Sequence, residues 1–135
     1  QLVKHMLNSG IPIDAVGIQA HHDSGGIDWL TQNNDLQNTI AKFKALGIDV
    51  YITEMDMAVR NNWNLSAARQ QKKDYYNYVL QAIRGGAARI NTWGIRDEDD
   101  HFWLTYDHPL LWDENSTKKP AYYGVKQALL DSKNN

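Results

Sequence analysis

Residues 47–57 read GIDVYITEMDM, and this stretch decides the fold. It starts with Gly47, a residue typical of helix ends, and continues through the mostly apolar run at residues 48–53, which predicts a strand. Two carboxylates, Glu54 and Asp56, follow where that run stops. A short buried strand that comes after a helix and ends in polar side chains is typical of a parallel sheet covered by helices.

The same pattern occurs three times along the chain. Helix-ending glycines stand 37 and 39 residues apart, at Gly10, Gly47 and Gly86. Each precedes a predicted strand, at residues 15–20, 48–53 and 88–93. Helical spacing and end signals predict helices over residues 36–46, 66–84 and 121–130, with Ser66 as the cap of the second, and the end of a further helix before Gly10. Residues 21–33, rich in Asp, Ser and Gly, predict a loop. The sequence therefore predicts successive βα units.

The composition excludes several classes of protein. The 135 residues include 14 Lys and Arg against 16 Asp and Glu, and the net charge of −2 gives no reason to expect nucleic acid or a membrane surface as a partner. The lack of cysteine excludes disulfide scaffolds and thiolate chemistry. No apolar run approaches the roughly 18 residues of a membrane span. The length suits one domain.

Polar or aromatic side chains follow each predicted strand. Gln19 and His21 end the first strand, Glu54 and Asp56 end the second, and Trp93 ends the third. Ligands of α/β proteins bind at the carboxyl ends of the strands, so these residues form the candidate site.

Alternation along the second strand predicts which side chains face that site. Ile52, Glu54 and Asp56 are expected on one face, with the neighbouring methionines on the helix side. An imidazole N–H from His21 would stabilise the ionised Glu54, and Asp56 on the other ring nitrogen would fix the tautomer. A buried polar network that only holds the strands in register is the alternative interpretation.

Four strings resemble, in this order and spacing, glycoside hydrolase family 10, the xylanase family: GIQAHH (17–22), YITEMDM (51–57), INTWGIRDEDDHFW (90–103) and HPLLWDENSTKKPAYYGVKQAL (108–129). The resemblance implies an α/β fold that forms the C-terminal part of a (β/α)8 TIM barrel, about strands six to eight with their helices. Residues 1–135 would then be a single partial catalytic domain that lacks the N-terminal part of the barrel. Open strand edges would favour self-association or pairing with the missing N-terminal segment.

The resemblance also implies a role for individual residues. Glu54 matches the catalytic nucleophile, His21 the histidine hydrogen-bonded to it, and Asp56 the carboxylate that orients this histidine. The implied substrate contacts are Gln19, Trp93 and Trp103.

The implied activity is that of a secreted, retaining endo-1,4-β-xylanase that hydrolyses xylan or xylo-oligosaccharides without a metal or other cofactor. Retention requires two carboxyl groups about 5–5.5 Å apart. The family's acid/base glutamate lies on strand four, outside this chain, so we expect the isolated chain to be inactive. The local candidates for a substitute acid resemble a solvated acidic loop instead: Asp97, Glu98, Asp99, Asp100 and Glu114.

Two other functions remain open from the residues alone. A non-catalytic carbohydrate-binding fragment would use the same aromatic and polar groups, and activity with and without the N-terminal half would distinguish it. A metal-dependent barrel hydrolase would use His and carboxylate ligands from the strand ends, and loss of activity on chelation would indicate it. The candidate ligands are His21, His22, Asp23, Glu54 and Asp56.

Overall fold

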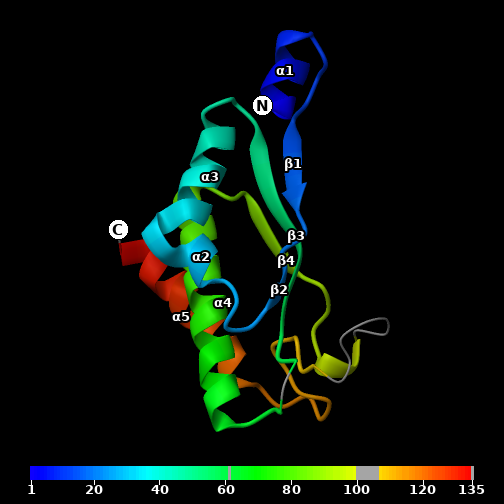
Figure 1. The fold of residues 1–135 in the computed structure, drawn as a ribbon, viewed down its shortest axis with the longest axis vertical. Helices are drawn as coiled ribbons and strands as arrows, with labels where there is room; N and C mark the ends of the chain where they lie inside the picture. The colour runs from blue at the N-terminus through cyan, green and yellow to red at the C-terminus, as the bar shows by residue number, and fades with distance from the viewer. Residues whose placement is uncertain (61, 100–106, 135) are drawn as a thin grey trace.

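The computed structural model describes residues 1–60, 62–99 and 107–134, which form a parallel sheet packed against helices (Figure 1). The strands are β1 (Ala15–Ile18), β2 (His21–Asp23), β3 (Asp49–Ala58) and β4 (Arg89–Thr92). The α-helices are α1 (Leu2–Asn8), α2 (Asp28–Thr31), α3 (Asp35–Lys44), α4 (Leu65–Gly85) and α5 (Pro120–Asp131). Short 3-10 helices span Gln32–Asn34, Asp97–Asp99 and Ser132–Asn134.

Strand β3 is the centre of the sheet and pairs in parallel with β1, β2 and β4. Strands β1 and β2 follow one path along β3 and are separated at Ala20, whose φ is +69°. The predicted βα units are therefore confirmed. The prediction of a continuous loop over residues 21–33 is wrong, because β3 extends to Ala58 and offers backbone partners to His21–Asp23.

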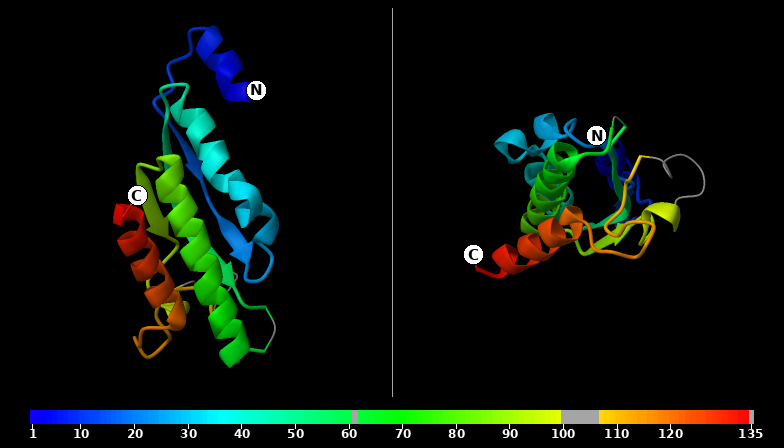
Figure 2. Two further views of the ribbon diagram at one scale, coloured as in Figure 1. Left: turned by 90° about the vertical axis from the view of Figure 1, so that its left-hand side faces the viewer. Right: turned by 90° about the horizontal axis from the view of Figure 1, so that it is seen from below.

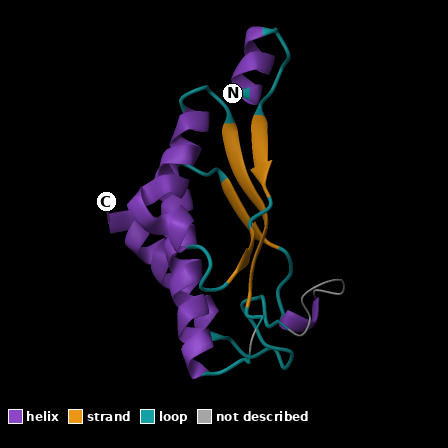
Figure 3. Cartoon of the chain, in the orientation of Figure 1, coloured by secondary structure: helices purple, strands orange, loops and turns teal. Residues whose placement is uncertain are grey.

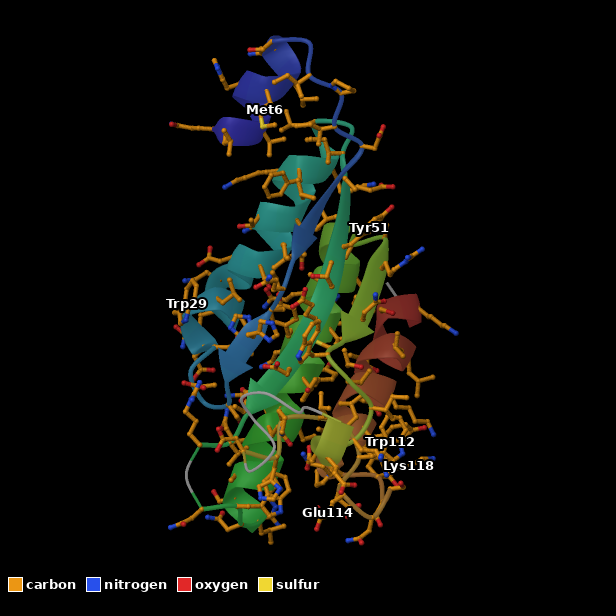
Figure 4. All side chains as sticks on the ribbon, turned by 90° about the vertical axis from the view of Figure 1, so that its right-hand side faces the viewer. Met6, Trp29, Tyr51, Trp112, Glu114 and Lys118 are labelled. Atoms are coloured by element: carbon orange, nitrogen blue, oxygen red, sulfur yellow. The ribbon has the colours of Figure 1, made fainter. Side chains whose placement is uncertain are left out.

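The helices α3, α4 and α5 lie on one side of the sheet, with α4 beside both of the others (Figures 2 and 3). Buried side chains of β3 and α4 fill the layer between sheet and helices, and together with Ile40 of α3 they form one apolar core. This part of the core consists of Val50, Ile52, Met55, Met57, Tyr75, Tyr78 and Val79. The arrangement leaves the opposite face of the sheet to carry the candidate site, and Figure 4 looks onto that face.

A register shift in β3 changes which residues share a face. The pairing of β3 with β4 is irregular between Ile52 and Met55. Ile52 is fully buried in the same apolar cluster as Met55, so its predicted place beside Glu54 is wrong. A bulge adds one residue to a strand and shifts the alternation, which explains the difference. The two carboxylates beyond the bulge keep their predicted common face.

The ends of the helices follow local chemistry. Asn64, rather than the predicted Ser66, caps α4, and its side-chain oxygen accepts hydrogen bonds from the backbone N–H groups of Ser66 and Ala67. The predicted helix-ending glycines all adopt positive φ. At Gly124, a Cβ would lie only 2.4 Å from the Lys72 carbonyl oxygen, so the close packing of α5 on α4 requires glycine.

Among the described residues, no helix combines the length and the apolar character that a membrane crossing requires.

Candidate active site

Three polar side chains form a hydrogen-bonded chain at the carboxyl end of the sheet. The Nδ1 atom of His21 lies 2.6 Å from Asp56 Oδ2, and its Nε2 atom lies 3.0 Å from Glu54 Oε2. The side chain of Asp56 is 1% exposed, that of Glu54 is 25% exposed and that of His21 is 38% exposed. Asp56 therefore holds the His21 ring on its buried side, and Glu54 is the carboxylate that solvent can reach.

The backbone fixes this arrangement. His21 pairs with Asp56 in the register of β2 and β3. The N–H groups of Glu54 and Asp56 donate to the carbonyl oxygens of Gln19 and Ala20, at 3.1 and 3.2 Å. Ala20 adopts a positive φ that is uncommon for a residue with a side chain, and such strain is frequent at functional sites. Gln19 is consequently next to Glu54 along the neighbouring strand.

Trp93 joins the site from β4. Its backbone N–H donates to the Met55 carbonyl oxygen at 3.1 Å, which fixes the residue just after the strand. The indole meets the His21 ring edge-on, with ring centroids 5.8 Å apart, and about half of Trp93 is exposed. The structure thus brings the side chains of four of the six predicted site residues together, Glu54, His21, Asp56 and Trp93, and pairs the backbone of the fifth, Gln19, with that of Glu54. The sixth, Trp103, lies outside the described residues.

The two carboxylates set the charge of the imidazole. Burial lowers the pKa of His21, but the hydrogen bonds to Asp56 and then Glu54 outweigh it, so the pKa is raised above 6.5. The protonated ring donates from both nitrogens and balances part of the negative charge of its neighbours. Glu54 Oε2 is held by this ring, and the Glu54 side chain remains partly exposed, so a substrate could reach it as a nucleophile requires.

We expect the His21 ring to titrate by NMR above pH 6.5 in the full-length protein. A raised folded-state pKa means that the stabilisation by protonated His21 is complete below about pH 6.5 and is lost as the pH rises through the folded-state value. Asp56→Asn should lower the titration midpoint and flatten the pH dependence of the melting temperature in that range. Asp49→Asn, at the other end of β3, should leave both unchanged. An unaltered midpoint in Asp56→Asn would contradict the assignment.

The hydrogen bonds of His21 are unfavourable to the hypothesis that His21, Glu54 and Asp56 bind a metal ion. Both ring nitrogens of His21 are engaged by carboxylates, so in this arrangement neither nitrogen faces a shared ligand position. A group of Asp97, His108 and Glu114 has metal-like spacing elsewhere in the described residues. The ammonium of Lys119 lies 2.9 Å from both Asp97 oxygens and already supplies a cation there.

The prediction that Asp97 lies on a solvated acidic loop is wrong. Its side chain is 3% exposed, and Oδ1 accepts from Lys119 Nζ at 2.9 Å and from the Leu110 N–H at 2.8 Å. Burial raises the pKa of Asp97, against the pull of the Lys119 charge. Asp97 is therefore half of a buried ion pair. Of the other four acidic candidates, Glu98 and Glu114 are exposed, and the side chains of Asp99 and Asp100 lie outside the described part.

One ion pair next to the site was missed at the sequence level. Arg60, two residues past the end of β3, donates from Nε to Oδ1 of Asp23, the last residue of β2. Alternation could have found this pair, because Asp23 continues the face of His21 and Arg60 continues the face of Asp56. The assumption that strands ended at residues 20 and 53 concealed it.

The fold and the site together define a class: an α/β protein with a parallel sheet and a carboxylate–imidazole–carboxylate chain at the carboxyl ends of its strands. The model of the family described as Glycosyl hydrolase family 10 matches residues 1–128. The chain belongs to this family.

Individual relatives agree with this membership. The chain is 27% identical over 133 residues to endo-1,4-beta-xylanase B of Thermotoga neapolitana, covering 95% of the chain and 37% of that relative. It is 33% identical over 159 residues to endo-1,4-beta-xylanase A of Cellvibrio japonicus, covering 95% of the chain and 24% of that relative. The chain thus spans less than half the length of either protein.

Solved structures give the same result for the fold. Native xylanase 10B from Thermotoga maritima superposes with a TM-score of 0.83 at 27% identity, covering 99% of the chain and 42% of that structure. A xylanase 10C mutant from Cellvibrio japonicus, in complex with xylopentaose, superposes with a TM-score of 0.81 at 28% identity, covering 96% of the chain and 30% of that structure.

Proposed function

We propose that this chain is the C-terminal part of a retaining endo-1,4-β-xylanase, with strands six to eight of a (β/α)8 barrel and Glu54 as nucleophile. The observation that carries the proposal is the Glu54–His21–Asp56 chain, in which one carboxylate is partly exposed and the other is buried behind the ring. The family membership and the xylanase names of the relatives support the substrate.

The proposed reaction has two steps. The carboxylate of Glu54 attacks the anomeric carbon and forms a glycosyl ester, while a second carboxyl group protonates the departing glycosidic oxygen. That second group then removes a proton from water, and the water displaces Glu54 from the same carbon. Two displacements restore the original configuration. The hydrogen bond from His21 holds the Glu54 carboxylate in position during the attack.

The second carboxyl group is proposed to come from outside these 135 residues. Asp56 is buried and engaged by His21, so it does not face a leaving group. The matched relatives are more than twice as long as this chain, which is consistent with a barrel completed by an N-terminal part. The outer edges of β1 and β4 are where that part would pair. On this proposal residues 1–135 are one portion of a single catalytic domain.

The remaining site residues are proposed to bind the sugar chain. The half-exposed indole of Trp93 offers a flat apolar surface next to His21, suited to the C–H face of a pyranose. The Gln19 backbone pairs with that of Glu54, and the exposed Gln19 side chain is proposed to hydrogen-bond the reacting sugar. Trp103 is proposed to add a second aromatic contact. Because polymeric xylan is too large to enter a cell intact, the full-length protein is proposed to act as a secreted enzyme.

Product stereochemistry tests the proposal. The full-length protein should release xylo-oligosaccharides from xylan, and the first product detected by NMR should be the β-anomer. Initial appearance of the α-anomer would contradict retention. Binding of xylo-oligosaccharide without turnover would instead support the carbohydrate-binding alternative, and activity that is lost with EDTA and restored by metal would support the metal-dependent one.

A further inference from the structure

Asp74 of α4 is a buried carboxylate that the proposed reaction does not use. Its side chain is fully buried, and none of the ion pairs among the described residues includes it. Its Oδ2 atom accepts from the Ser24 hydroxyl and from the Gly25 backbone N–H, both at 2.8 Å, and its Oδ1 atom accepts from Gln70 Nε2 at 2.8 Å. Because a buried carboxylate is costly without donors, these hydrogen bonds hold their partners firmly.

Two of the three hydrogen bonds come from the turn that follows β2. Gly25 has a φ of +83°, a left-handed conformation that glycine adopts readily, and its N–H donates to Asp74. The backbone N–H of Ser24 donates to the Ala58 carbonyl oxygen at 2.7 Å. The turn is therefore attached to α4 through the Asp74 side chain and to the end of β3 through its backbone.

Strand β2 needs this attachment because it is short. It consists of His21–Asp23 and pairs only with β3 among the described strands. It is separated from β1 at Ala20, so it does not continue a longer strand. Three residues make few backbone hydrogen bonds of their own, and the position of β2 consequently depends on what holds its two ends. The turn bound by Asp74 holds the end that follows Asp23.

We infer that Asp74 is a positioning residue for the hydrolysis: through the Ser24–Gly25 turn it keeps β2 in register with β3, and so keeps the His21 imidazole within hydrogen-bonding distance of Glu54. Hydrogen bonds weaken steeply when their geometry is lost, and a misplacement of about 1 Å can lower a rate by about 100-fold. The inference rests on the proposed function, because Glu54 is the proposed nucleophile.

Asp74→Asn in the full-length protein tests this inference. The substitution should lower kcat for a xylo-oligosaccharide by about 10- to 100-fold and change KM by less than about twofold. KM should hold because the proposed sugar contact at Trp93 follows β4 and does not depend on the turn. NMR should show a lower titration midpoint for His21, because the hydrogen bonds to Asp56 and Glu54 that raise its pKa would loosen.

Two substitutions that leave the charge unchanged separate positioning from stability. Ser24→Ala and Gln70→Ala each remove one donor that lies 2.8 Å from the Asp74 carboxylate, but only Ser24 belongs to the turn. Both should lower the melting temperature. Only Ser24→Ala should also lower kcat, by about three- to tenfold, and shift the His21 midpoint. Ser24→Ala decides the question if Asp74→Asn does not fold.

The outcomes separate this inference from the proposed function. A lower kcat and a shifted His21 midpoint in Ser24→Ala, with neither change in Gln70→Ala, support the positioning role. Wild-type kcat and midpoint in Ser24→Ala or in folded Asp74→Asn would overturn it, and so would equal losses of kcat in Ser24→Ala and Gln70→Ala. A wild-type protein that does not hydrolyse the oligosaccharide would overturn the proposed function instead, and the His21 midpoints would still test whether Asp74 positions the ring.

Discussion

Glu54→Ala is expected to lower kcat for xylan hydrolysis by about 10⁴- to 10⁶-fold in the full-length protein, the range seen when the nucleophile of a hydrolase is removed. The substitution deletes the group that would form the glycosyl ester and leaves His21 and Asp56 in place. Binding of a xylo-oligosaccharide should change by no more than about threefold, because the proposed contacts at Trp93 and Gln19 remain. Steady-state kinetics and calorimetric titration measure the two effects separately.

Two further experiments test the role of Glu54: a control substitution at another glutamate, and rescue of Glu54→Ala by azide. Glu114→Ala removes an exposed glutamate from the turn before α5, outside the Glu54–His21–Asp56 chain, and should retain wild-type turnover. Azide, a small anion, should occupy the space left by the missing carboxylate and restore product formation, as a glycosyl azide of inverted configuration. Near wild-type turnover in Glu54→Ala, or a loss of sugar binding as large as the loss of kcat, would show that Glu54 is not the nucleophile.

The Glu54–Asp56 part of the site could be predicted from the sequence because it depends only on residues that are close together along the chain. The run that ends in Glu54 and Asp56 is a buried strand with polar residues at its end, and period-two alternation places both carboxylates on one face whatever lies elsewhere. The spacing of the helix-ending glycines likewise predicted the βα order. Both inferences depend on neighbours along the chain, and both agree with the structure.

The features that were missed depend on long-range contacts. The bulge after Ile52 arises from pairing with β4, more than 30 residues away, and has no signal in the strand itself. Asp97 was assigned to a solvated loop because it begins an acidic run at residues 97–100, and its buried partner Lys119 comes 22 residues later. The extension of β2 to Asp23 required knowing that β3 reaches Ala58.

Lys119→Met is expected to destabilise the protein by about 3–5 kcal/mol, because it leaves the buried Asp97 carboxylate without its cation. Lys119 Nζ also donates to the His108 carbonyl oxygen at 2.6 Å and lies 4.7 Å from the Trp63 ring centroid. One ammonium therefore joins the loop after β4, the segment at His108, the loop before α4 and the start of α5. The melting temperature should fall by on the order of 10 °C.

The neighbouring lysine provides the control for this prediction. Lys118→Met changes an exposed side chain whose ammonium lies over the Tyr122 ring, and the loss should be under about 1 kcal/mol. The pH dependence identifies the cause. Without Lys119, burial should keep the folded-state pKa of Asp97 above its unfolded value near 3.9. The penalty should then be complete above the folded-state pKa and disappear as the pH falls below about 3.9. A penalty that persists unchanged at low pH, or equal effects of the two lysine substitutions, would show that the Lys119–Asp97 charge pair is not what holds these four segments together.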